Sequence, residues 1–137
     1  MLYAMLCYHQ EDVTCAWTKE EDAAVMAKLA LVQEGLARRG KLGPVARLLP
    51  TTAATTLRKD QEPPLIIDGP FAETKEQLLG FYVLDVDNLE EALQIAQDLA
   101  AANPGGAYEI RPIGLFNPGK PLAQTATHYG VATEVPA

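Results

Sequence analysis

The chain has 137 residues, of which 48% are hydrophobic, and a formal charge of −7 at neutral pH. This is the size of one ordinary domain, and such a domain buries roughly two thirds of the surface that its unfolded chain exposes. An acidic surface repels phosphate backbones and anionic lipids, so we expect neither nucleic acid nor a membrane surface as a partner.

The two cysteines, Cys7 and Cys15, do not form a C-x-x-C pattern. A disulfide framework is therefore not expected, which favours a reducing compartment. The N-terminus lacks the basic region of a signal peptide, and no apolar run approaches the ~20 residues needed to span a bilayer. Together these features predict a cytoplasmic protein.

The first half of the chain predicts a strand and then a helix. Leu2 to His9 is apolar at alternate positions on both faces, as in a strand covered on both sides. Thr18 and Glu21 have the spacing of a capping box, and Gly40 is a natural helix stop. Apolar residues recur between them at helical spacing: Val25, Leu29, Val32 and Leu36.

The middle of the chain predicts extended structure. A strand is expected around residues 45 to 49, followed by two extended runs, 55 to 58 and 65 to 67, around a polar turn. This pattern favours a hairpin. Pro63 and Pro64 limit pairing where the second run begins, which is typical of an edge position.

The second half repeats the order of the first. Residues 78 to 86 predict a strand, and Asn88 with Glu91 repeats the spacing of a helix cap. An apolar helical stripe follows, residues 103 to 106 (Asn-Pro-Gly-Gly) end the helix, and residues 108 to 115 return as a strand.

Two strand–helix–strand units predict an α+β fold, the ferredoxin-like split βαβ sandwich, with an inserted β-hairpin. The helices would cover one face of the sheet. The other face is also apolar, so we expect a second copy of the chain to cover it, giving a homodimer. Residues 1–116 form the expected domain, and residues 117–137 form a polar tail without a core pattern.

One segment stands out at the end of a strand: Asp68-Gly69-Pro70-Phe71. Gly69 and Pro70 force a turn, and Pro70 removes a backbone donor. Asp68 places a carboxylate at a strand end, where it can reach a cleft, and Phe71 is expected to pin the turn to the core.

This segment carries a family resemblance. Residues 68 to 77 (DGPFAETKEQ), followed by Leu79-Gly80-Phe81-Tyr82, resemble the signature of the DGPF branch of the YciI-like proteins. Glu109-Ile110-Arg111-Pro112 is similar to the E-x-R-P near the end of that signature, and residues 16 to 18 also match. The resemblance covers residues 2 to 115 and implies a dimeric α+β barrel with a cleft near the dimer interface.

The resemblance does not fix a reaction. Related dimeric α+β barrels include cofactor-free oxygenases, isomerases, haem proteins and non-catalytic ligand binders, and a fold does not determine a function. Some members are encoded beside extracytoplasmic-function sigma factors, which implies a connection with transcription control.

Six residues are candidates for a functional site, and each also has a structural interpretation. Asp68 is either an acid/base or ligand-binding group, or the acceptor that holds the Gly-Pro bend. His9 is either a proton carrier or a structural histidine. The candidate ligand-binding residues are charged and have ion pairing as the alternative: Glu73, Lys75, Glu109 and Arg111.

Neither metal nor cofactor is expected. Cys7 and His9 share a strand face, but a second pair of ligands with metal-site spacing is missing. The sequence also lacks a dinucleotide fingerprint, a P-loop and a G-x-S-x-G nucleophile motif.

Two hypotheses follow. The first is a cofactor-free acid/base enzyme for a small polar or anionic molecule, with Asp68 and His9 as catalytic residues and Arg111 orienting an anionic group. The second is a non-catalytic dimer that binds a metabolite or a protein and serves regulation. Convergence of Asp68, Glu73, His9 and Arg111 on one pocket would favour the first hypothesis.

Overall fold

The computed structural model describes residues 1–122; residues 123–137, with His128 and most of the predicted tail, lie outside the described residues. Residues 1–122 form six strands, three α-helices and a short 3-10 turn. In chain order these are β1 (Leu2–His9), α1 (Glu11–Thr14), α2 (Lys19–Arg38), β2 (Leu42–Arg47), η1 (Thr51–Ala53), β3 (Thr55–Arg58), β4 (Leu65–Asp68), β5 (Gln77–Asp85), α3 (Leu89–Ala102) and β6 (Ala107–Pro112).

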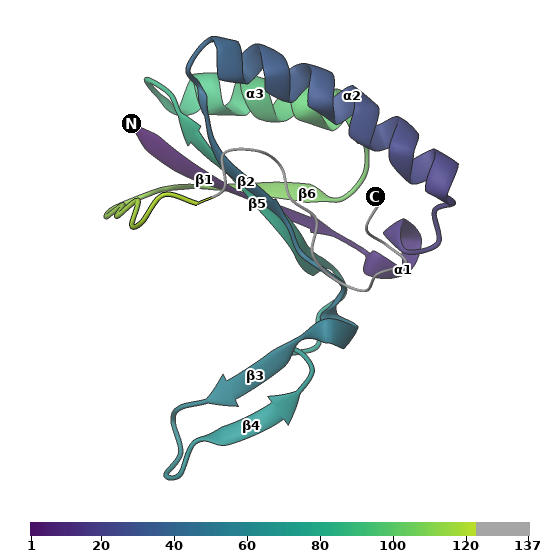
Figure 1. Ribbon diagram of the computed structural model, residues 1–137, viewed down its shortest axis with the longest axis vertical. Coiled ribbons are helices and arrows are strands. Elements are labelled where there is room, and N and C mark those ends of the chain that lie inside the picture. Colours follow the sequence, from purple (N-terminus) through teal and green to yellow (C-terminus); the bar gives the residue numbers. More distant parts are fainter. Residues whose placement is uncertain (123–137) are drawn as a thin grey trace.

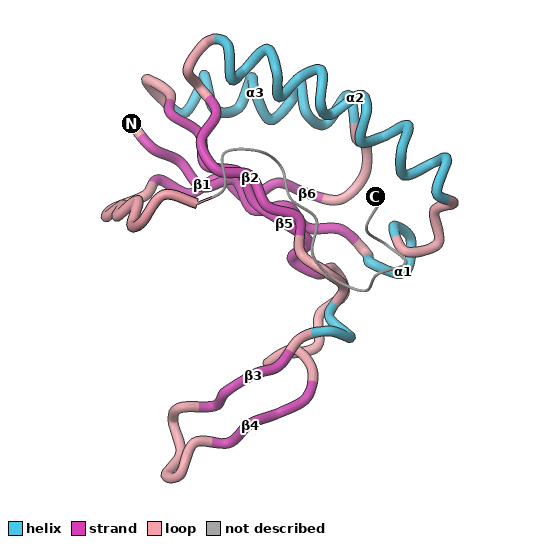
Figure 2. Tube along the Cα trace, viewed as in Figure 1, coloured by secondary structure: helices cyan, strands magenta, loops and turns pink. Residues whose placement is uncertain are grey.

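The main sheet has the ferredoxin-like topology that the sequence predicts. Its four strands lie in the order β2-β5-β1-β6, and every neighbouring pair is antiparallel. Figure 1 shows α2 and α3 side by side over one face of this sheet. Strands β3 and β4 form a separate two-stranded sheet, which Figure 2 shows as two magenta stretches of tube that project from the body. The α+β class and the inserted hairpin are thereby confirmed.

The ends of both long helices follow from their sequences. Thr18 accepts from the backbone N–H of Glu21 at 3.0 Å, and the Glu21 side chain accepts from the backbone N–H of Thr18 at 3.1 Å, so the capping box is present. Gly40 ends α2 with a φ of 70°, a conformation that glycine adopts without steric cost. Asn88 caps α3 by accepting from the N–H of Glu91 at 2.9 Å.

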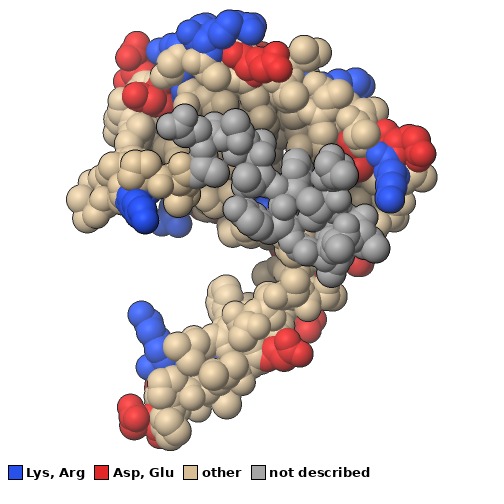
Figure 3. Space-filling model, viewed as in Figure 1, with Lys and Arg blue, Asp and Glu red and all other residues tan. Residues whose placement is uncertain are grey.

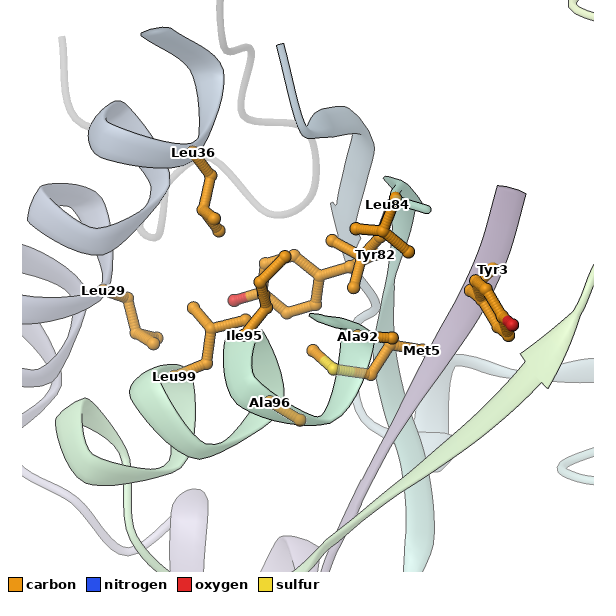
Figure 4. Close-up of a cluster of buried hydrophobic side chains, with 11 residues drawn as sticks. Tyr3, Met5, Leu29, Leu36, Tyr82, Leu84, Ala92, Ile95, Ala96 and Leu99 are labelled. Atoms are coloured by element: carbon orange, nitrogen blue, oxygen red, sulfur yellow. The ribbon is translucent and has the colours of Figure 1, made fainter. Parts of the chain in front are cut away.

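The core lies between the helices and the covered face of the sheet, as Figure 4 shows. Leu29 and Leu36 of α2 and Leu99 of α3 point toward the sheet residues Tyr82 and Leu84. Leu36, Leu84 and Leu99 are completely buried. Gln33 donates to the hydroxyl of Tyr82 at 3.0 Å, which provides the polar group of this buried residue with a partner.

Two strand boundaries differ from the sequence prediction. The second strand begins at Leu42 and ends at Arg47, earlier than the predicted residues 45 to 49, because Leu42 pairs with β5 and packs on the core. The last strand ends at Pro112 instead of residue 115, although the N–H of Ile113 still donates to the carbonyl of Leu2 at 2.9 Å. Leu115 is 90% exposed.

No helix within residues 1–122 is both long and apolar enough to cross a membrane.

Candidate functional site at the open face of the sheet

The face of the main sheet that points away from α2 and α3 is called the open face here. Strand alternation places on it the even-numbered residues of β1 and the odd-numbered residues at the centre of β5. Its apolar side chains are partly exposed: Leu2, Ala4, Leu6, Tyr8, Leu79, Phe81 and Val83. Two charged residues of β6 share this face, because Glu109 pairs with Leu6 and Arg111 pairs with Ala4.

The apolar character of this face distinguishes it from an ordinary wet sheet surface. An antiparallel sheet with one solvated face normally alternates apolar and polar residues along each strand. Here β1 is apolar on both faces, as the sequence predicted, with Tyr3 and Met5 buried on the covered side. The open face is therefore more apolar than the solvated face of an ordinary antiparallel sheet.

Glu109 and Arg111 are both exposed on β6, which ends at Pro112. Within residues 1–122 neither side chain makes an ion pair or a side-chain hydrogen bond. Arg111 thus presents its guanidinium donors to the space in front of the open face.

His9 belongs to the other side of the sheet. Alternation along β1 puts it on the covered face with Cys7, and its ring lies against the α3–β6 connection. A Cβ on Gly105 would come within 2.7 Å of His9 Nε2, so the connection packs closely on the ring. His9 Nδ1 is buried and has no hydrogen-bond partner in the described part of the chain.

Asp68, Glu73 and Lys75 lie on the projecting hairpin and its return to the body. We call residues 51–76 the arm. All three side chains are exposed, and they form no ion pair with any residue of the described range 1–122. The DGPF segment thus lies on the arm, away from the core.

The turn at the DGPF segment is held by the backbone and Thr56. Gly69 N–H donates to the carbonyl of Ala54 at 2.8 Å, and the hydroxyl of Thr56 donates to the carbonyl of Gly69 at 2.8 Å. Asp68 itself makes no side-chain hydrogen bond to a described residue, so it is not the acceptor that holds the bend. Phe71 is 73% exposed, and the expectation that it pins the turn to the core is wrong.

The six predicted site residues therefore fall into three places. Asp68, Glu73 and Lys75 are on the arm, Glu109 and Arg111 are on the open face, and His9 is on the covered face. No hydrogen bond or ion pair joins these three places within residues 1–122. An acid/base pair of Asp68 and His9 has no geometric support in one copy of the chain.

Three ionisable groups on the covered face have raised pKa values: Cys7, Tyr82 and Tyr108. Burial raises the pKa of the Cys7 thiol to about 12, so the thiolate that a nucleophile requires is scarce at neutral pH. Burial also raises the pKa of Tyr82, against the opposing effect of the hydrogen bond from Gln33, and it raises the pKa of Tyr108. These groups pack the core and do not form an activated catalytic cluster.

A polar connection at the base of the arm was not predicted from the sequence. Glu11 accepts from the backbone N–H of Thr51 at 3.0 Å and also from the Thr51 hydroxyl. The backbone N–H of Glu11 donates to the side chain of Gln77 at 2.9 Å. Three segments distant in sequence meet here, so only the folded chain reveals the connection.

Two comparisons bear on identity. Residues 1–117 match the family model of the YCII-related domain. An uncharacterised protein of Rhizobium meliloti (strain 1021) is 60% identical to this chain over 121 residues, which make up 88% of this chain and 98% of that protein.

Proposed function

The chain belongs to the family of proteins with a YCII-related domain, and from that premise we propose that it works as a homodimer that binds a small anionic molecule. Two open faces pack toward each other in this dimer, and the ligand lies at their margin. The same proposal places the chain in the DGPF branch of the family, on the basis of Asp68-Gly69-Pro70-Phe71 and Glu109-x-Arg111-Pro112.

The observation that carries the dimer is the apolar open face. Leu6 and Phe81 are cross-strand partners at its centre, and both are partly exposed in a single copy. Burying apolar surface contributes about 25 cal/mol per Å². A second open face is apolar in the same way, so a two-fold arrangement covers both surfaces at once.

Arg111 supports the choice of an anionic ligand. Its guanidinium group lies at the margin of the apolar face and has no carboxylate partner within residues 1–122. Its planar fork of donors matches a carboxylate or a phosphate group. Glu109 on the same face would select against ligands that place a second negative charge near it.

Binding without catalysis is the function that this arrangement favours. The candidate acid/base residues Asp68 and His9 are on different parts of the fold, and Cys7 is held as a neutral thiol by burial. Such a binding dimer would also suit a regulatory role, connected with sigma-factor-type transcription control.

The dimer is tested by size-exclusion chromatography with light scattering at micromolar concentration. We expect twice the mass of the 14.8 kDa chain, and we expect Leu6→Glu to give the mass of one chain. A wild-type protein that elutes as a monomer would remove the proposal.

The ligand is tested by a thermal-shift screen of small carboxylates and phosphates. A ligand present at 100 times its dissociation constant adds about 2.7 kcal/mol of stability. We expect Arg111→Gln to abolish the shift, while Arg39→Gln on the helical side leaves it unchanged. Recovery of the ligand unaltered supports a binding module, and recovery of an altered molecule would overturn it in favour of an enzyme.

A further inference from the structure

The arm exposes apolar side chains that a lone hairpin has no means to bury. Leu57 and Ile66 are cross-strand partners, 58% and 71% exposed, and Phe71 is 73% exposed. Among the described residues 1–122, strands β3 and β4 pair only with each other. An isolated two-stranded hairpin is marginally stable in water, so this arm needs a surface to pack on.

The arm is positioned on the side of the sheet opposite the helices, as Figure 1 shows. In the space-filling view of Figure 3, a hollow separates the arm from the body of the molecule. The base of the arm is braced by the hydrogen bond that Thr51 donates to the Glu11 carboxylate and by the one that the Glu11 backbone N–H donates to Gln77. The arm is thus held away from its own sheet.

We propose that the arm is a clasp that packs its apolar side chains on a second copy of this chain. This inference rests on the proposed homodimer and adds a second contact region to it. Each copy would extend its arm across the partner whose open face it meets, and the partner would extend its own arm in return.

Interface size is the argument for a second copy as the occupant. A stable interface buries roughly 800 Å² and engages about 20–30 residues on each partner. The apolar side chains of the open face on β1 and β5, together with the two charged residues on β6, are fewer residues than such an interface engages. The arm supplies further apolar surface, and Figure 1 shows it on the side of the sheet opposite the helices, which is the side of the open face.

Two-fold symmetry also favours a second copy of the chain as the partner of the arm. In a two-fold dimer each surface patch is used twice, so one partner species can cover both the open face and the arm. A shallow pocket of about 230 Å³ on the arm, lined by residues that include Thr56, Arg58 and Phe71, offers a place for a side chain of the partner. Its lining combines apolar surface with a cation.

The test uses substitutions at positions that are exposed in a single copy, so the fold of one chain does not depend on them. We would introduce Leu57→Glu and Ile66→Glu together and measure the dimer dissociation constant by sedimentation equilibrium. The matched control is Leu31→Glu on α2, where the replaced leucine is 69% exposed on the helical side. We expect at least a tenfold weaker dimer for the arm variant and an unchanged dimer for the control.

The outcomes separate the clasp from the dimer itself. A dimer that Leu6→Glu breaks but the arm variant leaves intact would overturn the clasp and keep the proposed dimer. A wild-type monomer would overturn both. Equal weakening by the arm variant and by Leu31→Glu would also overturn the clasp, because the effect would then come from added negative charge.

Hydrogen exchange gives an independent measurement. The backbone amides of β3 and β4 should become more protected as the protein concentration rises through the dimer dissociation constant. Protection that does not depend on concentration would overturn the clasp, and so would protection that appears only when a different protein is added.

Discussion

The carboxylate of Glu11 holds Thr51 in place across the base of the arm. It accepts from the Thr51 backbone N–H at 3.0 Å and also from the Thr51 hydroxyl, in a part-buried environment. A charged acceptor and two donors from one residue fix the direction in which the chain leaves β2 and enters the arm. Glu11 is also the first residue of the short helix α1, which was not predicted from the sequence.

Glu11→Ala should destabilise the protein by about 1–2 kcal/mol, because it leaves the Thr51 N–H without its charged acceptor. The free energy of unfolding in urea measures the effect. Glu34→Ala serves as the control, since Glu34 is exposed on α2. Equal losses for both variants would show that the brace contributes nothing specific.

The ion pair between Lys41 and Glu91 predicts a pH dependence. Their charged atoms are 2.9 Å apart, and the hydrogen bond from Lys41 lowers the pKa of Glu91 below its ordinary 4.5. A lowered folded-state pKa contributes stability above the unfolded value, which is lost as the pH falls through the folded pKa. The stability difference between wild type and Glu91→Gln should therefore be constant near neutral pH and shrink below about pH 4.5.

The same pair predicts a second window at high pH. The hydrogen bond to Glu91 raises the pKa of Lys41 above its ordinary 10.5, so its contribution is complete below that value and is lost as the pH rises through the folded pKa. Denaturation curves of wild type and Glu91→Gln at several pH values check both windows. A difference that stays constant from acid to alkaline pH would contradict the assignment.

The two thiols should react at very different rates. Cys15 is exposed, whereas burial raises the pKa of Cys7 to about 12 and also limits access to its sulfur. In the native protein at pH 8 we expect a disulfide reagent to modify Cys15 quickly and Cys7 slowly, and both quickly after denaturation. The variant Cys15→Ser identifies the fast thiol; a fast native reaction that survives this substitution would contradict the prediction.

Gly106→Ala should be one of the most damaging small substitutions in the chain. Gly106 has a φ of 77°, and an added Cβ would lie 2.1 Å from the carbonyl oxygen of Tyr8. Backbone strain of this kind costs about 1–3 kcal/mol, and the steric clash adds to it. The midpoint of thermal unfolding measures the loss.

Gly114→Ala is the matched control for this substitution. An added Cβ at Gly114 would meet no atom within 4 Å, and its φ is not positive. It should leave stability unchanged or raise it slightly, because alanine restricts the unfolded chain. Similar behaviour of the two variants would mean that the α3–β6 connection does not pack on β1 as described.

The layered fold could be predicted because its signals are local and repeated. Thr18 with Glu21 and Asn88 set the starts of the long helices, and strand alternation set the apolar faces of β1. The end of the last strand was harder to predict. Strand β6 ends at Pro112 because its pairing with β1 ends there, and the composition of the segment does not indicate this. The resemblance to the YciI-like family was confirmed over residues 1–117.

The candidate site was harder to predict because it depends on contacts between distant segments. In the sequence, Phe71 looks like a core anchor and Asp68 like a strand-end carboxylate that reaches a cleft, yet the hairpin carries both away from the core. His9 and Arg111 lie on opposite faces of the sheet, a separation that only the strand register reveals. The roles proposed for these residues remain predictions for experiment.

The position of the arm in the chain also has an evolutionary consequence. It is inserted between β2 and β5, which are hydrogen-bonded antiparallel neighbours in the main sheet. The arm is thus an enlarged version of the loop that joins any such pair of strands. The entropic free-energy cost of closing a loop grows only slowly with its length. Insertions and deletions in the arm can therefore accumulate in descendants of this chain without any change in strand order, so this segment is where related proteins can diverge in length while sharing one core.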